Sequence, residues 1–108
     1  YLLDQVKFEP YAIVLNGEIV QLNNLATLLK NHTQWKVTIV GYTDDSGEPH
    51  ANLKLSQQRA QAVKDYLTQR GITADRLTAE GKGEANPIAP NKYSWGRAQN
   101  RRIEVTLH

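Results

Sequence analysis

A long helical pattern lying between two short strand patterns is the feature that most constrains the fold of this chain. The pattern runs from about Pro49 or Asn52 to Arg70. Gly71 follows it and can adopt the left-handed conformation that commonly ends a helix. Apolar and small residues recur along one side of this segment at helical spacing, at Ser56, Ala60, Val63 and Leu67. One side of the predicted helix must therefore be buried against other elements.

Extended or alternating patterns predict four strands. The corresponding segments are Val6–Phe8, Lys36–Tyr42, Arg76–Gly81 and Arg101–Leu107. Pro10 ends the first of them, because proline supplies no backbone N–H to a sheet. The segment from Glu84 to Tyr93 contains two prolines and is expected to be a loop, followed by a short turn of helix at Ser94–Gln99.

A second main helix is expected after the pair Asn16-Gly17, which favours a turn. Its apolar residues fall at i, i+3, i+4 and i+7, at Leu22, Leu25, Ala26 and Leu29. A hairpin through Asn16-Gly17 is the alternative, because Asn-Gly also suits a tight hairpin turn.

The resulting order is β-α-β-α-β-β, counting the two main helices. This order predicts an α/β (α+β) sandwich with a mixed four-stranded sheet and two main helices on one face. The strands are too few and too short to favour a closed barrel. We expect residues 1–108 to form a single domain, since no repeat or low-complexity segment interrupts the chain.

Composition excludes several classes of protein. The 108 residues are 40% hydrophobic and 22% charged, which is typical of a globular domain. No apolar run approaches the roughly 18 residues that a membrane-spanning helix needs. The absence of cysteine excludes a disulfide scaffold and thiol catalysis. A net charge of +2 is too small to imply a polyanionic partner.

No candidate catalytic or metal-binding motif in the sequence has the residue spacing that its chemistry requires. The three histidines are scattered, which argues against a zinc site. The acidic segment 44–48 lacks the glycine and glutamate that a calcium-binding EF-hand loop requires. The Gly81-x-Gly83 pair is followed by Asn86 and Pro87 where a dinucleotide-binding helix would begin. No serine has the context of a nucleophile elbow. We therefore predict no enzyme activity, no cofactor and no metal.

Two opposite charges stand out at the junction between a strand and the long helix. Asp44 follows the end of the strand Lys36–Tyr42, and Arg59 lies inside the helix on the stripe of Asn52 and Leu55. Ligands of open α/β sheets bind beyond the carboxyl ends of strands. A carboxylate and a guanidinium there would suit a small zwitterion. A structural Asp44–Arg59 salt bridge is the alternative.

These residues belong to a longer pattern. It comprises Gly41-Tyr42-Thr43-Asp44-Asp45-Ser46-Gly47, Asn52-x-x-Leu55-Ser56-x-x-Arg59-Ala60-x-x-Val63, Gly81-x-Gly83-Glu84 and Gly96-Arg97-Ala98-x-Asn100-Arg101-Arg102-Ile103-Glu104. The pattern resembles the OmpA-like peptidoglycan-binding domain family, which includes the peptidoglycan-associated lipoprotein and MotB. The likeness extends from about Val6 to the end of the chain. It implies non-covalent binding of the peptidoglycan stem peptide through its diaminopimelate residue.

The resemblance also implies roles for individual residues. Asp44 and Arg59 would hold the diaminopimelate, Thr43 and Leu55 would form pocket walls, and Asn52 would organise the loop and the helix start. The family has an aspartate soon after a first-strand phenylalanine, whereas here Phe8 is followed by Glu9, which could replace that contact. Tyr42 stands where the family usually has histidine.

Other residues have two interpretations each. Strand alternation places Arg101 and Arg102 on opposite faces of a strand. We expect one of them to have a structural role and leave the role of the other open. Arg102 is also a candidate contact to the ligand. Trp35 and Trp95 are expected to be partly buried packing residues, with sugar stacking by Trp95 as the alternative.

The expected role is that of a periplasmic anchor. The domain would be the C-terminal part of a longer exported protein, and an upstream region would attach it to the outer membrane. The expected partner is the stem peptide, with membrane contact only through segments outside this chain. Acidic residues near Asp44 argue against nucleic acid. The alternative is a scaffold of the same fold that binds proteins and no ligand.

Overall fold

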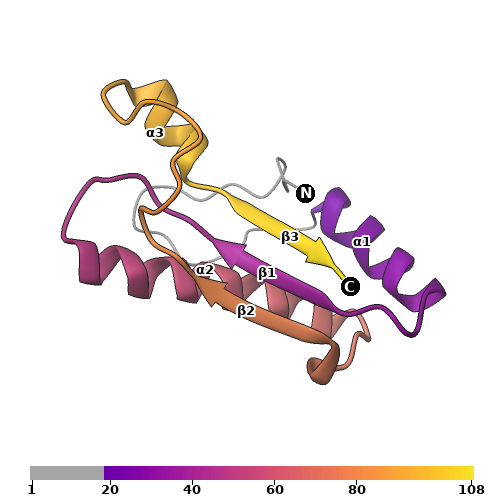
Figure 1. Cartoon of the computed structure of the whole chain (residues 1–108). Coiled ribbons are helices and arrows are strands. Elements are labelled where there is room, and N and C mark those ends of the chain that lie inside the picture. The colour runs from indigo at the N-terminus through magenta and orange to yellow at the C-terminus, as the bar shows by residue number, and fades with distance from the viewer. Residues whose placement is uncertain (1–18) are drawn as a thin grey trace.

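The computed structural model of the chain describes residues 19–108. Three α-helices and three strands follow one another in the order α1, β1, α2, β2, α3, β3, with a short 3-10 helix before β2 (Figure 1). Their bounds are Val20–Asn31 for α1, Val37–Gly41 for β1, Pro49–Gln69 for α2, Ala74–Arg76 for the 3-10 helix, Leu77–Gly81 for β2, Ser94–Asn100 for α3 and Ile103–Leu107 for β3. These bounds confirm the expected elements between residues 19 and 108 to within two residues at nearly every end.

The sheet has the strand order β2-β1-β3, with β1 in the centre. β1 runs parallel to β2, to which α2 connects it, and antiparallel to β3. Ile39 therefore lies between Ala79 of β2 and Val105 of β3. The expected mixed sheet is thus present, with its parallel pair joined by a helical crossover.

The prediction of a four-stranded sheet is wrong: the sheet has three strands within residues 19–108. The sequence places the remaining strand at Val6–Phe8, which lies outside the described residues, as does the Asn16-Gly17 turn. A three-residue extended run is a weak basis for a strand, because strand formation depends on packing against neighbours that the local pattern does not reveal.

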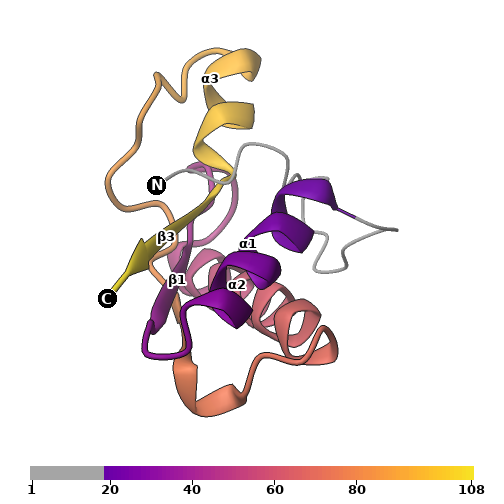
Figure 2. The same ribbon diagram turned by 90° about the vertical axis from the view of Figure 1, so that its right-hand side faces the viewer.

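α1 and α2 lie on the same face of the sheet, as expected (Figure 2). Their apolar stripes and the buried face of the sheet form one hydrophobic core. Its members are Leu22, Leu25, Ala26, Leu29, Val37, Ile39, Ala60, Val63, Leu67, Ile72, Leu77, Ile103 and Val105. The helical periodicity of the sequence predicted seven of these positions, all of them on the two main helices.

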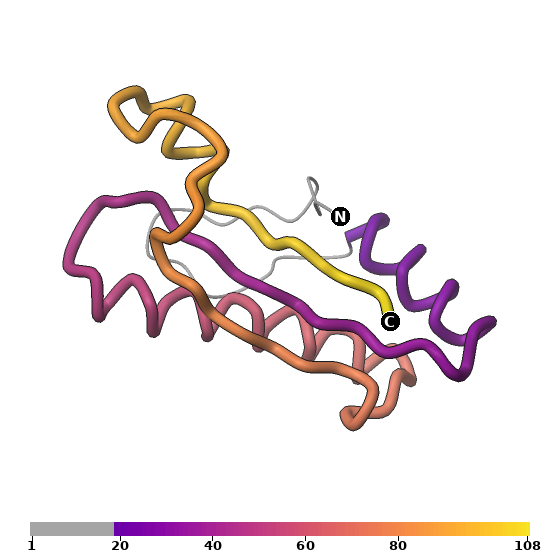
Figure 3. Tube along the Cα trace, viewed as in Figure 1, coloured from indigo at the N-terminus to yellow at the C-terminus, as the bar shows by residue number. Residues whose placement is uncertain are grey.

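Two glycines allow α2 to lie close to the sheet. A Cβ atom at Gly41 would overlap the carbonyl oxygen of Ser56, and one at Gly81 would overlap the backbone N–H of Gln57. The first half of α2 is therefore held against the carboxyl ends of β1 and β2. At that end the chain passes from β1 to α2 and from β2 to α3 (Figure 3).

Candidate functional site

The loop after β1 is fixed at its start by both neighbouring segments. The N–H of Tyr42 donates to the carbonyl of Arg102 at 2.9 Å, and the N–H of Thr43 donates to the carbonyl of Gly83 at 2.8 Å. Because the loop is hydrogen-bonded on both sides, Thr43 and Asp44 are buried although they lie beyond the strand. The loop thus presents Asp44 from a rigid base.

The end of the loop is joined to the first turn of α2. The Glu48 carboxylate accepts hydrogen bonds from the N–H groups of His50 and Ala51, which lowers the pKa of Glu48 and caps the helix. Asn52 donates from Nδ2 to the carbonyl of Ser46 at 2.8 Å. This bond matches the organising role that the resemblance implies for Asn52.

The loop, α2 and α3 enclose a pocket of about 340 Å³. A volume near the lower end of the usual range suits a small ligand or one side chain of a larger one. Its lining consists of Thr43, Asp44, Ser46, Asn52, Leu55, Arg59, Ser94, Arg97 and Arg101. All five of the main residues selected from the sequence, namely Thr43, Asp44, Asn52, Leu55 and Arg59, therefore lie around one cavity.

Asp44 is ionised in this environment. Burial by itself would raise the pKa of the Asp44 carboxyl. Hydrogen bonds from Ser46 and from Arg101, together with the charge of Arg101, outweigh burial and hold the pKa below its ordinary value. Asp44 Oδ1 accepts the N–H of Ser46 at 2.8 Å, and Oδ2 accepts Nη1 of Arg101 at 2.5 Å.

Arg59 is a buried cation. Its side chain is among the largest that the fold encloses, with 1% of the residue exposed. Burial and the positive charge of Arg101 lower the pKa of Arg59 to about 10, while the charge of Asp44 acts in the opposite direction. The guanidinium therefore stays charged at neutral pH. An added carboxylate in the pocket would stabilise it.

The charges around the pocket are unbalanced. Among residues 19–108, three arginines, Arg59, Arg97 and Arg101, line it together with a single acidic residue, Asp44. Arg97 also donates to the carbonyls of Asn91 and Lys92, which holds it at the α3 side of the cavity. A pocket with this excess of positive charge favours ligands that carry more carboxylates than ammonium groups.

The remaining candidates from the sequence lie elsewhere. Arg102 does not line the pocket: its guanidinium lies 3.8 Å from the centroid of the Tyr42 ring and forms an ion pair with Glu104. Arg102 also donates to the carbonyl of Asn86. These contacts match the structural interpretation given to one arginine of the pair. Phe8 and Glu9 lie outside the described residues.

Sequence reasoning missed Ser94 and Arg97 and left the role of Arg101 open. All three come from α3 or its end, so they depend on how α3 is placed beyond the end of the sheet (Figure 1). Asn100 fixes that placement, because its amide exchanges hydrogen bonds with the backbone of Ile88 and Ala89. The opposite orientation expected for Arg101 and Arg102 was the available signal, since it sends Arg101 to the pocket and Arg102 to Tyr42.

Among residues 19–108, no cluster of three or more histidines and acidic residues could hold a metal ion. No helix in the same part of the chain has the length and apolar character needed to cross a bilayer.

The mixed sheet with two helices on one face defines an α/β sandwich, and a charged pocket lies at one end of it, where β1 leads into α2. Residues 8–101 match the model of the OmpA family, and the chain belongs to that family. The domain of this family is a binding and anchoring fold rather than a catalytic one.

Curated relatives extend beyond the chain. The probable lipoprotein YiaD of Escherichia coli is 45% identical over 86 residues, which cover 80% of this chain and 39% of that protein. The peptidoglycan-binding protein ArfA of Mycobacterium tuberculosis is 46% identical over 87 residues, which cover 81% of this chain and 27% of ArfA. The chain therefore spans between a quarter and two fifths of the length of these two relatives.

Solved structures share the fold. The peptidoglycan-associated lipoprotein of Burkholderia pseudomallei superposes with a TM-score of 0.90 at 31% identity, covering 95% of this chain and 88% of that structure. The cell wall anchor of the type VI secretion system (T6SS) of Pseudomonas aeruginosa superposes with a TM-score of 0.79 at 33% identity. That match covers 94% of this chain and 74% of the anchor structure.

Proposed function

We propose that this domain binds the stem peptide of peptidoglycan non-covalently through its diaminopimelate residue. In this way it would anchor a membrane protein or lipoprotein to the cell wall. The observation that carries the proposal is the position of Asp44 and Arg59 in the lining of one pocket. A cell-wall partner is also supported by the names of three similar proteins: the peptidoglycan-binding protein ArfA, the peptidoglycan-associated lipoprotein and the cell wall anchor of the type VI secretion system.

The chemistry of the ligand fits the charges. Beyond its peptide bonds, diaminopimelate carries one free ammonium and one free carboxylate on its far carbon. The ionised Asp44 would accept hydrogen bonds from the ammonium, and Arg59 would donate a two-pronged pair to the carboxylate. Leu55 would contact the methylene chain between the two ends of the ligand.

The remaining charged residues of the pocket would interact with the other carboxylates of the peptide. The excess positive charge from Arg97 and Arg101 suits a stem peptide, which carries further carboxylates beside the diaminopimelate. Because the loop and the start of α2 are already hydrogen-bonded together, binding would require little reorganisation of the backbone. The protein holding this domain would be periplasmic, attached to the outer membrane through a part outside this chain.

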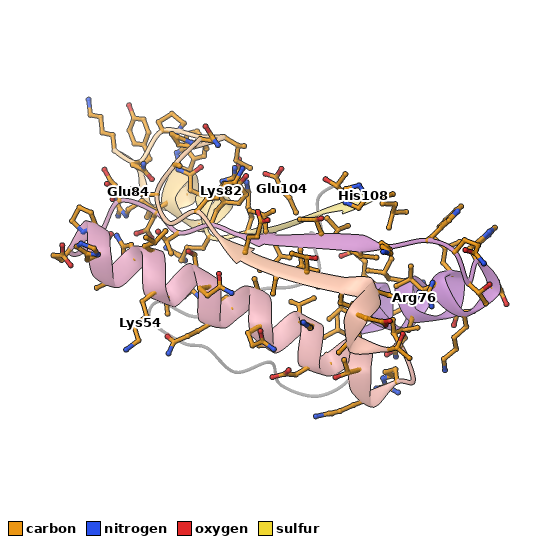
Figure 4. All side chains as sticks on the ribbon, turned by 60° about the horizontal axis from the view of Figure 1, so that its bottom comes forward. Lys54, Arg76, Lys82, Glu84, Glu104 and His108 are labelled. Atoms are coloured by element: carbon orange, nitrogen blue, oxygen red, sulfur yellow. The ribbon has the colours of Figure 1, made fainter. Side chains whose placement is uncertain are left out.

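A calorimetric titration with a purified diaminopimelate stem peptide tests the proposal. Saturable one-to-one binding is expected, and Asp44→Ala or Arg59→Ala should weaken it by about 2–5 kcal/mol, because each leaves a ligand charge unpaired in a buried site. The matched controls are Asp45→Ala and Lys54→Ala, which remove exposed charges next to Asp44 and on α2. Lys54 does not line the pocket and lies on the side of α2 that faces away from the sheet (Figure 4).

The absence of binding by a folded wild-type domain would contradict the proposal. The same fold would then serve as a scaffold for protein partners, and the charged residues of the pocket would have a structural role.

A further inference from the structure

An exposed aromatic pair lies at the start of α3. The rings of Tyr93 and Trp95 are stacked with their centroids 5.6 Å apart and their planes 9° from parallel. Exposure is 47% for Tyr93 and 53% for Trp95, so Trp95 is more exposed than the packing role expected from the sequence requires. Exposed indole rings are costly in water, which makes a stacked, half-exposed pair a candidate contact surface.

Exposed apolar side chains are concentrated in this region. Five large hydrophobic residues are exposed among residues 19–108, and three of them lie in the segment from Ile88 to Trp95. The other two, Val20 and Leu53, lie on α1 and α2. By contrast, Trp35 is only partly exposed and stacks on His32 with ring centroids 3.9 Å apart.

The aromatic pair is continuous with the pocket. Ser94 lines the pocket and lies between Tyr93 and Trp95 in the chain, and Arg97 lines it one turn further along α3. α3 itself is held firmly, because Gly96 packs against the backbone of Pro90 and Asn100 is fully buried and hydrogen-bonded to the preceding loop. The backbone that carries the two rings is therefore held in place next to Ser94, which lines the pocket.

Of the two rings, Trp95 offers the better open face. The Lys92 ammonium lies 5.7 Å from the centroid of the Tyr93 ring, so Tyr93 is already in contact with a cation as well as with Trp95. Tyr93 thus stacks on one face of Trp95, and within residues 19–108 no ring or cation contact is formed by the other face of the indole.

We propose that Trp95, backed by Tyr93, stacks on a pyranose ring of the glycan strand to which the stem peptide is attached. This inference rests on the proposed function. If the pocket binds the stem peptide, the sugar to which that peptide is attached lies close to the aromatic pair next to the pocket. Pyranose rings present a face of C–H groups that packs on aromatic rings, while their hydroxyl and acetamido groups stay in water. A surface of two rings beside a charged pocket would thus recognise peptide and sugar together.

The test compares two ligands on the same protein. One is the free stem peptide, and the other is the same peptide carrying its N-acetylglucosamine–N-acetylmuramic acid disaccharide. The disaccharide should tighten binding to the wild-type domain by about threefold to tenfold, the range expected for one aromatic stacking contact. Trp95→Ala should abolish this gain without changing the affinity for the free peptide, and Trp95→Phe should retain part of it.

Val20→Ala is the matched control, because Val20 is an equally exposed apolar side chain on α1. A direct signal is available as well, since the chain has only two tryptophans. In a Trp35→Phe variant the fluorescence of Trp95 should change with the disaccharide-peptide and not with the free peptide.

The outcomes separate the two proposals. If neither ligand binds, the proposed function fails. If both ligands bind wild type with equal affinity and the Trp95 fluorescence does not respond to the sugar, the pocket assignment stands and the glycan contact is wrong. A fluorescence shift with anionic lipid vesicles instead of the disaccharide would also overturn it and assign the aromatic pair to a membrane surface.

Discussion

Asp44 and Arg101 are 57 positions apart in the sequence and are joined by a 2.5 Å hydrogen bond between Oδ2 and Nη1. The bond connects the loop after β1 to the end of α3, so the pocket is closed by an ion pair across two distant segments. In the proposed complex, the ammonium of the ligand would share Asp44 with Arg101. Arg101 therefore acts together with Ser46 to lower the pKa of Asp44 before any ligand is bound.

Replacing Arg101 should raise the pKa of Asp44. In Arg101→Gln, Asp44 loses a charged hydrogen bond and a neighbouring cation, while burial still favours the protonated form. Carboxyl-detected NMR titration of Asp44 measures this directly. Arg97→Gln is the control, because Arg97 lines the same pocket but donates to the carbonyls of Asn91 and Lys92. An Asp44 pKa that is equal in wild type and Arg101→Gln would contradict the account.

Asp44 should stabilise the folded state only at pH values at which its carboxyl group is ionised. Its pKa is lowered in the folded state relative to the ordinary value of 3.8, so the stabilisation is complete above about pH 5 and is lost as the pH falls through the folded-state pKa. Asp44→Asn should reduce the free energy of unfolding by about 2 kcal/mol at pH 6, as expected for a charge-assisted hydrogen bond. The difference should shrink toward pH 2.

Urea denaturation at the two pH values measures the Asp44 effect. Asp45→Asn provides the comparison, since Asp45 is exposed and its replacement should change little at either pH. A deficit in Asp44→Asn that is unchanged at pH 2 would show that the lost stability is not due to the ionised carboxylate.

Gly41 should be intolerant of a side chain. Gly41→Ala places a methyl group against the backbone of Ser56, so α2 must move away from β1. The free energy of unfolding should fall by about 1–3 kcal/mol, the usual cost of overpacking. Stem-peptide affinity should fall as well, because the displaced helix carries Arg59. Wild-type stability in this variant, measured by thermal and chemical denaturation, would contradict the close packing.

Arg76 should matter for stability and not for binding. Its guanidinium donates to the carbonyls of Trp35, Leu29 and His32 at 2.8–3.0 Å and so joins the end of α1 to the segment before β1. It lies at the opposite end of the sheet from Lys82 and Glu84, which are near α3 (Figure 4). Arg76→Ala should reduce the free energy of unfolding by about 2–4 kcal/mol. Stem-peptide affinity at a temperature where the variant is folded should be unchanged.

Much of the fold could be predicted because its elements follow local rules. The stripe of Leu22, Leu25, Ala26 and Leu29 and the stop signal at Gly71 depend on residues close together in the chain. The number of strands could not be predicted in this way, because a strand needs a partner strand that is often far away in sequence. The four-strand prediction was wrong for that reason.

In the pocket, too, residues close together in the sequence could be predicted and residues from a distant segment could not. Asp44, Asn52, Leu55 and Arg59 could be selected because a loop and the helix after it occupy neighbouring stretches of sequence, and the family resemblance added Thr43. Ser94, Arg97 and Arg101 reach the pocket only because Asn100 and Gly96 position α3 above it, and no short-range pattern encodes that placement. The Asp44–Arg101 pair was missed because the sequence indicated Arg59 as the natural partner of Asp44.

A thermodynamic cycle tests whether the buried Arg59 binds the far carboxylate of diaminopimelate. Stem peptides with diaminopimelate and with lysine, which lacks that carboxylate, are titrated into wild type and Arg59→Gln. Wild type should bind the diaminopimelate peptide at least about tenfold more tightly, and Arg59→Gln should bind the two peptides equally. Equal affinity for both peptides in wild type, or a preference that persists in Arg59→Gln, would contradict the account.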